Sequence, residues 1–476
     1  MVAEENNKTK NALKAGTWYV ISSIIVKGIA VASTPIFTRL LTTSEYGMVA
    51  TFLSWYALLS PICSCCLSFS VGRAKLDYAS DLDGFVGSIQ TLSLLLSLIV
   101  TTILLAGRNI IEKFFCLNSS VYDMLIIYLI VSPIIEFKQN RFRYRYQYKQ
   151  NIAIALFLSI TTVLLSLVLV ITLPGNRANL RVAGVVIPSI ILSLGLWIES
   201  FAKKNVKINK EYWKYGLTIS APLIFHTLSL NILSQSDRIF ITKFCGDEQT
   251  GIYSLIYSYG LLITVITNAI ADGWLPWFHD SYYNQRFDDI KKNVKWVVVF
   301  GCFIGLACVA LAPEAIMILG GEEYSSGLLC VPPIVIGVVC QFIYTHYVNI
   351  ELHLKKTKYV AIGTVMAALI NIILNAIFVP MYGFVAAAYT TLASYVILLI
   401  GHYIITTRLL KIRLYNDRYM FLSIIITAGA CHALQYTYKL SILRYSIIVL
   451  GIIVFVILYK DIIIQILKNR KKKTNE

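Results

Sequence analysis

The sequence has few charged residues for its length. Asp, Glu, Lys and Arg make up 14% of its 476 residues, whereas 57% are hydrophobic, and the mean hydropathy is +0.69. A soluble protein carries roughly a quarter charged residues, so this composition excludes a soluble globular domain. Most of the surface must face lipid, and we expect an all-α polytopic membrane protein.

Several functional signatures are absent. There is no G-x-x-x-x-G-K-[ST] phosphate loop, and the longest connections, near 138–150, 202–214 and 278–293, are only about a dozen residues each. A nucleotide-binding domain has no room, which excludes a self-contained ATP-driven pump. Paired C-x-x-C zinc spacing is also missing among the ten cysteines, so we expect no metal, no cofactor and no disulfide framework.

Apolar runs long enough to cross a bilayer recur along the whole chain. A crossing helix needs roughly 20 residues, and fourteen runs qualify. The first run, from about residue 15, is too long for a signal-peptide core and should remain as a span. The expected spans are 15–38, 45–71, 85–106, 121–137, 151–173, 182–201, 215–243, 251–277, 294–312, 328–350, 359–379, 383–407, 419–437 and 445–467.

The positive charge is distributed as a multi-pass topology requires. Alternate connections hold 31 Lys and Arg, and the other connections hold 9. Because cytoplasmic loops carry the excess of positive charge, this bias predicts that both termini are cytoplasmic. The net charge of +17 therefore indicates membrane topology and not nucleic-acid binding, which would group the cations on a folded polar domain.

Two stretches of the chain are alike. Phe37-Thr-Arg39 and Phe240-Ile-Thr-Lys243 each end a span, and each is followed eight residues after its cation by a glycine, Gly47 or Gly251. This pattern favours a parallel internal repeat, although short turns with Gly also recur by chance. The expected organisation is a cytoplasmic segment 1–14, an N-lobe 15–201, a basic linker 202–214, a C-lobe 215–407, two further helices within 419–467, and a basic cytoplasmic tail 468–476. A central cavity is expected between the lobes.

Polar residues at membrane depth identify candidate site residues. Lys27 lies near the middle of the first run, where a charged side chain costs roughly 2.5–3.5 kcal/mol, and Thr34 shares its helical face. A polar cavity wall explains this face best, although pairing of Lys27 with a structural acid is the alternative. The candidate residues of the substrate cavity are Lys27, Thr34, Arg39, Asn231, Asp237, Arg238, Asn268, Asn371 and Asn375.

Some of these residues have simpler explanations. Asp237 and Arg238 could form a local pair that needs no substrate. His226 and Asp272 are candidates for ion coupling, although a lone His in a helix is more often a structural residue. Glu136, Glu199 and Glu351 lie near the ends of their spans, where we expect the interface to solvate them.

A cavity that is rich in cations and hydroxyl groups suits an anionic, sugar-bearing cargo. Arg and Lys hold phosphate oxygens through charge-assisted hydrogen bonds, while Asn, Thr, Tyr and Trp suit sugar rings. A lipid-linked glycan diphosphate has both features, and its head group cannot cross hydrocarbon unaided. The pattern permits this substrate without singling it out.

Particular segments are familiar. KAGTWYVISSIIVKGI (14–29), TPIFTRLLTTSEYG (34–47), SQSDRIFITKFCGDEQTGIYS (234–254) and the stretch 371–391 resemble the Wzx-type polysaccharide-repeat flippases, which transport O-antigen or capsule units. These proteins belong to the superfamily of multidrug and toxic-compound (MATE) exporters and lipid II flippases. The resemblance covers nearly the whole chain, and TPIFTRLLTTSEYG is its most specific motif.

The resemblance implies twelve to fourteen helices in two lobes around a cationic cavity, working by alternating access. It implies a non-enzymatic flippase in the bacterial cytoplasmic (inner) membrane, driven by an ion gradient, whose cargo is an undecaprenyl-diphosphate-linked repeat unit. The polysaccharide polymerase machinery is an expected partner. Arg39 and Arg238 match recurrent motif cations, and Lys27 lies where a cavity charge is expected.

Two alternatives stay open. A multidrug exporter of the same superfamily would favour an acidic cavity, whereas the deep charge here is a lysine. A membrane glycan polymerase or ligase would be an enzyme with a large external loop, and no such loop is visible.

Overall fold

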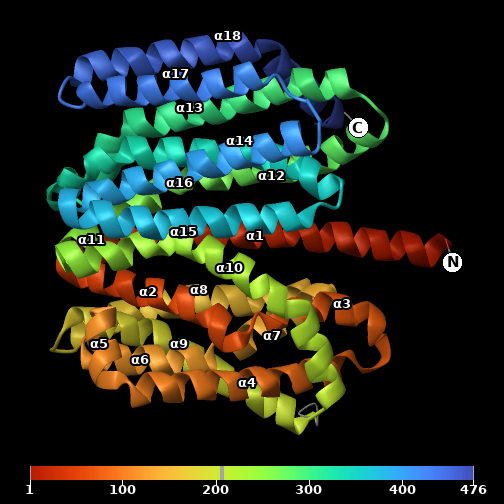
Figure 1. Cartoon of the computed structure of the whole chain (residues 1–476), viewed down its shortest axis with the longest axis vertical. Coiled ribbons are helices and arrows are strands. Elements are labelled where there is room, and N and C mark those ends of the chain that lie inside the picture. Colours follow the sequence, from red (N-terminus) through yellow and green to blue (C-terminus); the bar gives the residue numbers. More distant parts are fainter. Residues whose placement is uncertain (1, 204–207, 475–476) are drawn as a thin grey trace. The chain divides into compact units, whose positions relative to one another are not determined.

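The computed structural model describes residues 2–203 and 208–474, with side-chain surroundings for 15–203 and 208–460. The described residues form helices joined by short connections, and no strand occurs among them (Figure 1). The helices are α1 (Val2–Leu40), α2 (Thr43–Ser64), α3 (Ser70–Asp77), α4 (Leu82–Ala106), α5 (Arg108–Phe115), α6 (Ser119–Val131), α7 (Pro133–Tyr144), α8 (Tyr148–Thr172), α9 (Arg177–Ala202), α10 (Lys210–Cys245), α11 (Asp247–Gly260), α12 (Leu262–Tyr283), α13 (Phe287–Leu319), α14 (Val331–His353), α15 (Thr357–Tyr382), α16 (Phe384–Ile404), α17 (Asp417–Tyr436) and α18 (Ser441–Thr474).

The fourteen spans expected from the sequence are confirmed in number and order. Fourteen described segments are long and apolar enough to cross a membrane, from Ala15–Leu40 to Ser441–Lys460. The fourth span consists of α6 and α7, which meet at Pro133, and the eighth consists of α11 and α12. The protein is therefore an all-α polytopic membrane protein.

The second span is shorter than the sequence suggested. The apolar run continues to residue 71, but α2 ends at Ser64 because Cys65 and Cys66 adopt left-handed backbone conformations, with φ of 46° and 51°. Pro61 in the last turn also removes a backbone donor. A 3₁₀ turn, Leu67–Phe69, and the short helix α3 follow.

The chain forms two compact units. The first comprises Met1–Leu255, Ile318–Tyr324 and Ala361–Ser394, and the second comprises Ile256–Met317, Ser325–Val360 and Tyr395–Glu476. The division into lobes 15–201 and 215–407, with a cavity between them, stays a prediction. Lys204 and Lys207 of the expected linker lie outside the described residues, as do residues 475–476 of the tail.

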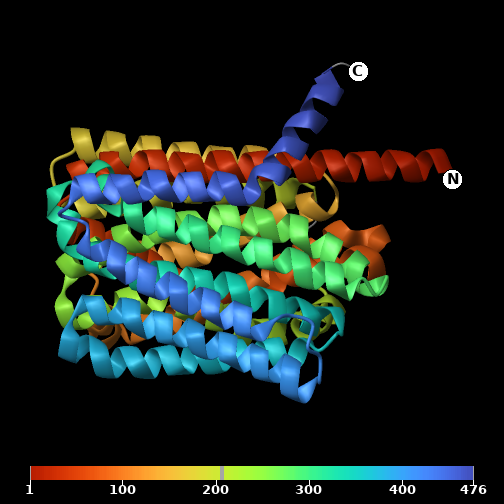
Figure 2. The same cartoon turned by 90° about the horizontal axis from the view of Figure 1, so that it is seen from above.

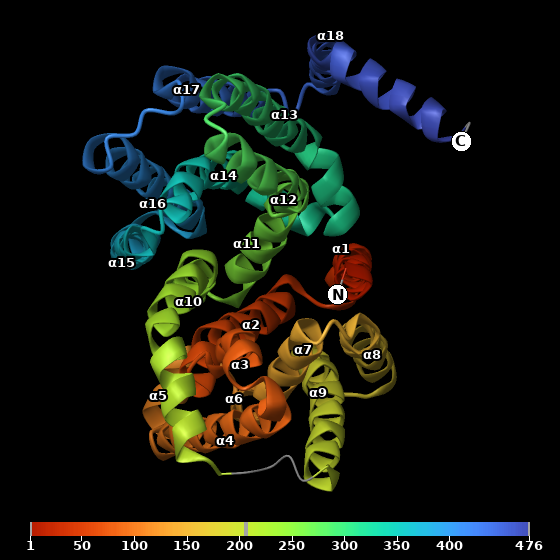
Figure 3. The ribbon, with the colours of Figure 1, turned by 90° about the vertical axis from the view of Figure 1, so that its right-hand side faces the viewer.

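Neighbouring helices of the first unit pack closely. α1 runs alongside α8 (Figure 2), and a view along the helices shows α8 beside α9 and α2 beside α10 (Figure 3). A Cβ atom on Gly184 of α9 would lie 2.5 Å from Cα of Ser166 in α8, so these backbones approach as only glycine permits. Phe52, Tyr122, Leu125 and Val182 form part of a buried core between α2, α6 and α9.

Candidate functional site

The segment 34–47 connects α1 to α2 and bonds to the Ile318–Tyr324 segment of the same unit. Thr38 Oγ1 donates to the carbonyl oxygen of Leu319 at 2.5 Å, and Arg39 Nη2 donates to that of Ile318 at 3.2 Å. Arg39 Nη1 also donates to the Pro35 carbonyl at 2.9 Å, while the arginine side chain stays exposed. The bonds to Ile318 and Leu319 satisfy carbonyl groups at the end of α13, so Arg39 has a structural role. Its role in the cavity stays a prediction.

The start of α2 is fixed by a capping box. The Glu45 backbone N–H donates to Thr42 Oγ1 at 3.2 Å, and the Thr42 N–H donates to the Glu45 carboxylate at 2.9 Å. This reciprocal pair satisfies two free amides of the first turn. Further along α2, Thr51 Oγ1 lies 2.7 Å from Thr242 Oγ1 of α10. A Cβ atom on Gly47 would lie 2.8 Å from the backbone nitrogen of Gly251, so the two similar stretches of the sequence meet in space.

Asp237 of α10 is the centre of a buried polar cluster. Its side chain is wholly buried, and its carboxylate accepts hydrogen bonds from Tyr253 Oη at 2.6 Å, Asn375 Nδ2 at 2.8 Å and Thr391 Oγ1 at 2.7 Å. The donors come from α11, α15 and α16, so four helices of the first unit converge on one acid. We define the Asp237 cluster as Ser236, Asp237, Tyr253, Asn371, Asn375, Thr390 and Thr391.

The remaining members of the Asp237 cluster extend this network. Ser236 Oγ donates to Asn371 Oδ1 at 2.7 Å, Asn371 Nδ2 donates to Thr391 Oγ1 at 3.1 Å, and Thr390 Oγ1 donates to Asn375 Oδ1 at 2.5 Å. The predicted residues Asp237, Asn371 and Asn375 are thus brought together. The cluster contains many neutral oxygen ligands around one carboxylate, which is the donor set that hard cations prefer.

Arg238 is buried beside this cluster and has its own partners. Its Nε donates to Ser254 Oγ at 3.2 Å, and its Nη1 donates to the carbonyl oxygen of Ser234 and to Gln235 Oε1 at 2.8 and 3.1 Å. Arg238 also lies within electrostatic range of Asp237. The structure therefore places both charges in one buried region, and a local pair between them stays a prediction.

Lys27 occupies the middle of the α1 span, Ala15–Leu40, and its side chain is exposed. It forms no ion pair with a residue whose side chain is described. Pairing with a structural acid, the alternative reading of Lys27, therefore finds no support here. Thr34 is half-buried and donates to the carbonyl oxygen of Ala30 at 2.9 Å.

The other candidates are dispersed. His226 is half-buried, with Nδ1 3.1 Å from Thr364 Oγ1, and Asn231 Nδ2 donates to the Ala57 carbonyl at 2.6 Å. Both contacts lie within the first unit. Asn268 and Asp272 are exposed on α12 in the second unit. His226 therefore has the hydrogen-bonded environment typical of a structural histidine, while a coupling role for His226 or Asp272 stays a prediction.

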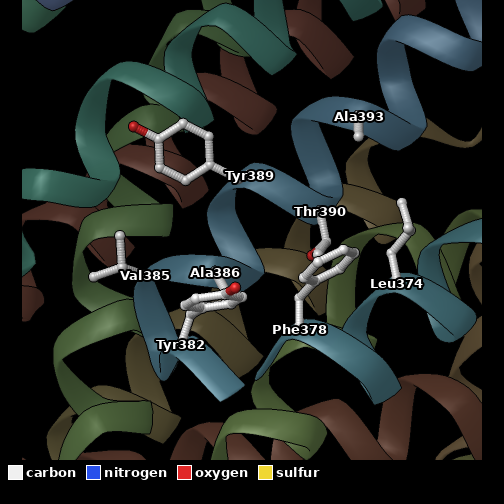
Figure 4. Close-up of a pocket in the computed structure, with 8 residues that line it drawn as sticks. All are labelled: Leu374, Phe378, Tyr382, Val385, Ala386, Tyr389, Thr390 and Ala393. Carbon is white, nitrogen blue, oxygen red and sulfur yellow. The ribbon is translucent and has the colours of Figure 1, made fainter. Parts of the chain in front are cut away.

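An apolar groove adjoins the Asp237 cluster on α15 and α16. It encloses about 430 Å³ and is lined by Leu374, Phe378, Tyr382, Val385, Ala386, Tyr389, Thr390 and Ala393 (Figure 4). Thr390 lies on the groove and also belongs to the cluster. The groove walls are hydrocarbon and aromatic rings, which suit an alkyl chain and not a charged head group.

The sequence missed several residues. Tyr253, Thr390 and Thr391 were not predicted. A signal for the two threonines was present, because α16 follows α15 after a short turn and an antiparallel pair of helices would bring Thr390 and Thr391 beside Asn375. The expectation that the interface solvates Glu351 is wrong. Its side chain is wholly buried, and its Oε1 lies 2.9 Å from His402 Nδ1. Since the helices of the second unit cover that end of α14, the interface does not solvate it.

Comparison with known proteins identifies the family. A family model described as "Polysaccharide biosynthesis protein" matches residues 12–282, which is more than half of the chain. A curated relative, Lsg locus putative protein 1 of Haemophilus influenzae, is 21% identical over 197 residues. That alignment covers 39% of this chain and 49% of the relative, so the chain spans about half the length of the relative.

Solved structures share the fold at low sequence identity. The lipid II flippase MurJ in an inward closed conformation has a TM-score of 0.63 and 14% identity, covering 93% of this chain and 99% of that one. An inward-facing multidrug resistance MATE family transporter of the MOP superfamily has a TM-score of 0.61 and 13% identity, covering 89% of this chain and 99% of that one. A MOP superfamily transporter from Pyrococcus furiosus has a TM-score of 0.51 and 13% identity, covering 89% of this chain and 97% of that one. The chain therefore belongs to the polysaccharide biosynthesis protein family and is a multi-pass membrane protein with the fold of MOP-superfamily flippases and transporters.

Proposed function

We propose that this protein is a flippase that moves undecaprenyl-diphosphate-linked oligosaccharide repeat units, of the O-antigen or capsule type, across the bacterial cytoplasmic membrane by alternating access. Both termini lie in the cytoplasm, in accord with the 31-to-9 bias of positive charge between alternate connections. The family match supports a role in polysaccharide biosynthesis. The polymerase that uses the repeat units is the expected partner on the outer side.

The observation that carries the proposal is the exposure of Lys27 at the centre of a span. A lysine that faces acyl chains at this depth costs roughly 2.5–3.5 kcal/mol, and such residues usually face a water-filled passage. Since Lys27 has no acidic partner among the described side chains, its charge is available to an anionic cargo. A diphosphate head group matches this charge, whereas an organic cation, the usual cargo of a multidrug exporter, does not.

We also propose that the Asp237 cluster binds the coupling ion. A carboxylate buried within a span is expensive unless something compensates its charge. The neutral donors Tyr253, Asn375 and Thr391 compensate it only in part, and the nearby Arg238 divides its charge among hydrogen-bond partners of its own. A proton or a sodium ion bound at Asp237 would complete the compensation. Because α10, α11, α15 and α16 all supply ligands, occupancy would change how these four helices pack together.

Deletion and complementation test the transport role. Loss of the gene should abolish surface polysaccharide and leave lipid-linked repeat units accumulated on the cytoplasmic face. The wild-type gene should restore the glycan, and Lys27→Ala should not. Normal glycan with altered drug tolerance would favour a multidrug exporter. Accumulation of flipped but unpolymerised units on the outer face would favour a polymerase or ligase.

Purified protein in proteoliposomes tests the coupling ion. Transport of a lipid-linked oligosaccharide should respond to an imposed sodium or proton gradient, and Asp237→Asn should remove this response because the amide carries no charge. His226→Ala and Asp272→Asn are the matched comparisons. If either comparison variant loses the gradient response while Asp237→Asn keeps it, the coupling site lies elsewhere.

A further inference from the structure

Arg181 of α9 lies at a meeting point of α1, α8 and α9. Its Nη1 donates to Ser166 Oγ of α8 at 2.6 Å, and its guanidinium carbon lies 4.0 Å from the centroid of the Phe37 ring. Ser166 and Phe37 are buried, whereas Arg181 is half-buried. The arginine is therefore held in one place without being fully enclosed.

Arg181, like Lys27, has no acidic partner among the described side chains, whereas three other buried or half-buried cations have one. Lys138 pairs with Glu199, Arg141 pairs with Asp83, and Arg444 pairs with Glu314. Arg181 forms no ion pair with a residue whose side chain is described. The titratable group within its electrostatic range is the phenol of Tyr46, which also lies in range of Arg238.

The unused face of Arg181 has the geometry of an anion receptor. Nη1 is occupied by Ser166, while Nε and Nη2 have no hydrogen-bond partner among the described side chains. These two nitrogens form the side-on fork that binds two oxygens of one phosphate or carboxylate group in parallel. Tyr46 packs against the apolar cluster that contains Phe37, whose ring lies against Arg181, so its hydroxyl group can add a third donor.

We propose that Arg181 and Tyr46 form a phosphate-binding site, separate from Lys27, that receives the diphosphate of the cargo near the outer face of the membrane. The position near the outer face rests on the proposed function and topology, since Arg181 lies at the start of the sixth span. An anion at this point supplies the charge compensation that the protein itself lacks. Phe37 and Tyr46 both belong to the motif TPIFTRLLTTSEYG, so the motif contributes two residues to the site.

Binding to purified protein in phosphatidylcholine nanodiscs tests the site. Three probes separate the sources of the anion: inorganic pyrophosphate, a polyprenyl diphosphate, and phosphatidylglycerol. Binding is measured by native mass spectrometry and by the increase in thermal stability at saturating probe. The variants are Arg181→Met, Arg181→Lys and Tyr46→Phe, and Arg177→Met is the matched control. Arg177 lies one turn earlier on α9, and its Nη1 donates to the Leu40 carbonyl.

We expect Arg181→Met to weaken binding of the polyprenyl diphosphate at least tenfold, Arg181→Lys to weaken it by a smaller factor, and Arg177→Met to leave it unchanged. Pyrophosphate binding that depends on Arg181 supports a site for the head group alone. Binding of the polyprenyl diphosphate alone supports a site that also needs the lipid tail. Phosphatidylglycerol binding as tight as that of the polyprenyl diphosphate contradicts a cargo site.

Folding and function can be separated. If Arg181→Met does not fold, the site is tested by comparing polyprenyl diphosphate binding of Arg181→Lys with that of Arg177→Lys. Both variants keep the positive charge, and only Arg181→Lys removes the proposed fork of two nitrogens. Wild-type protein that flips cargo, with affinities for polyprenyl diphosphate within twofold in all variants, refutes the Arg181 site and leaves the proposed function intact. Wild-type protein that does not flip cargo refutes the proposed function.

Discussion

Gly47 of α2 and Gly251 of α11 contact each other in a reciprocal way. A Cβ atom on Gly47 would lie 1.8 Å from the carbonyl oxygen of Asp247, and one on Gly251 would lie 2.0 Å from that of Thr43. Each glycine thus meets the carbonyl group four residues before the other, which is the pattern of a local two-fold axis. These glycines occupy matching positions in the two similar stretches of the sequence, so the positions that match in sequence also match in space.

Alanine at either glycine should destabilise the protein. The added methyl group would collide with backbone atoms, which cannot turn aside as a side chain can, and overpacking of this kind costs about 1–3 kcal/mol. We expect Gly47→Ala and Gly251→Ala to lower the midpoint of thermal unfolding in detergent by several degrees. Labelling of the buried cysteines with a thiol-reactive dye during heating measures this midpoint.

Gly195→Ala is the control for these variants. A Cβ atom on Gly195 of α9 meets nothing within 4 Å, and alanine favours the helix by up to about 1 kcal/mol. The control should be neutral or slightly stabilising. Equal unfolding midpoints for Gly47→Ala and Gly195→Ala would mean that α2 and α11 do not approach at these glycines.

Asn375→Ala should weaken the Asp237 cluster. The substitution removes the hydrogen bonds that Asn375 Nδ2 donates to Asp237 at 2.8 Å and to Asn371 Oδ1 at 3.1 Å, while Thr390 keeps the Ala387 carbonyl as an acceptor. A buried polar group left without its partner costs about 1–3 kcal/mol. The thermal-unfolding assay should show this loss, whereas Asn268→Ala, at an exposed position, should unfold like the wild type. A wild-type midpoint for Asn375→Ala would contradict the hydrogen-bond assignment.

Arg39 separates a structural role from a transport role. Arg39→Ala removes donors to the Pro35 and Ile318 carbonyl groups, so stability and transport should fall together, with a stability loss of about 1 kcal/mol. Arg39→Lys keeps one donor group, so its stability and its transport activity should lie between those of the wild type and those of the alanine variant. If Arg39→Ala keeps its unfolding midpoint and loses transport, Arg39 acts on the cargo, as the sequence predicted.

Asp77, which lies outside the membrane spans, makes the stability of the protein depend on pH. Tyr215 Oη donates to the Asp77 carboxylate at 2.6 Å, and this bond, followed by that from Arg73, holds the pKa of Asp77 below its ordinary value of 3.8. Because the folded pKa is the lower one, the stabilisation is complete above the unfolded value and is lost as the pH falls through the folded value.

Tyr215→Phe tests this linkage. The variant should unfold at a lower temperature than the wild type at pH 7, and the difference should shrink as the pH falls below about 3.8. Thermal unfolding measured between pH 3 and pH 7 follows the change. Tyr283→Phe, at a side chain that is 83% exposed, is the control. A gap between wild type and Tyr215→Phe that is constant across this range would show that the Asp77 carboxylate does not carry the effect.

The sequence by itself determined the membrane class, the fourteen spans, and the resemblance to flippases. Each of these depends on local properties, because an apolar run of sufficient length inserts as a helix whatever its neighbours are. It also identified Asp237, Asn371 and Asn375 as polar residues inside spans, since a polar residue in an apolar run is conspicuous without any structure.

The tertiary structure alone decided which residues meet. Asp237 is bonded to Asn375 and Thr391, which lie 138 and 154 residues further along the chain, and no local pattern links them. Nothing in the sequence links Arg181 with Phe37 and Tyr46, which the fold brings together with it. Helix periodicity fixes which face a side chain occupies, but the neighbour on that face depends on how distant helices pack.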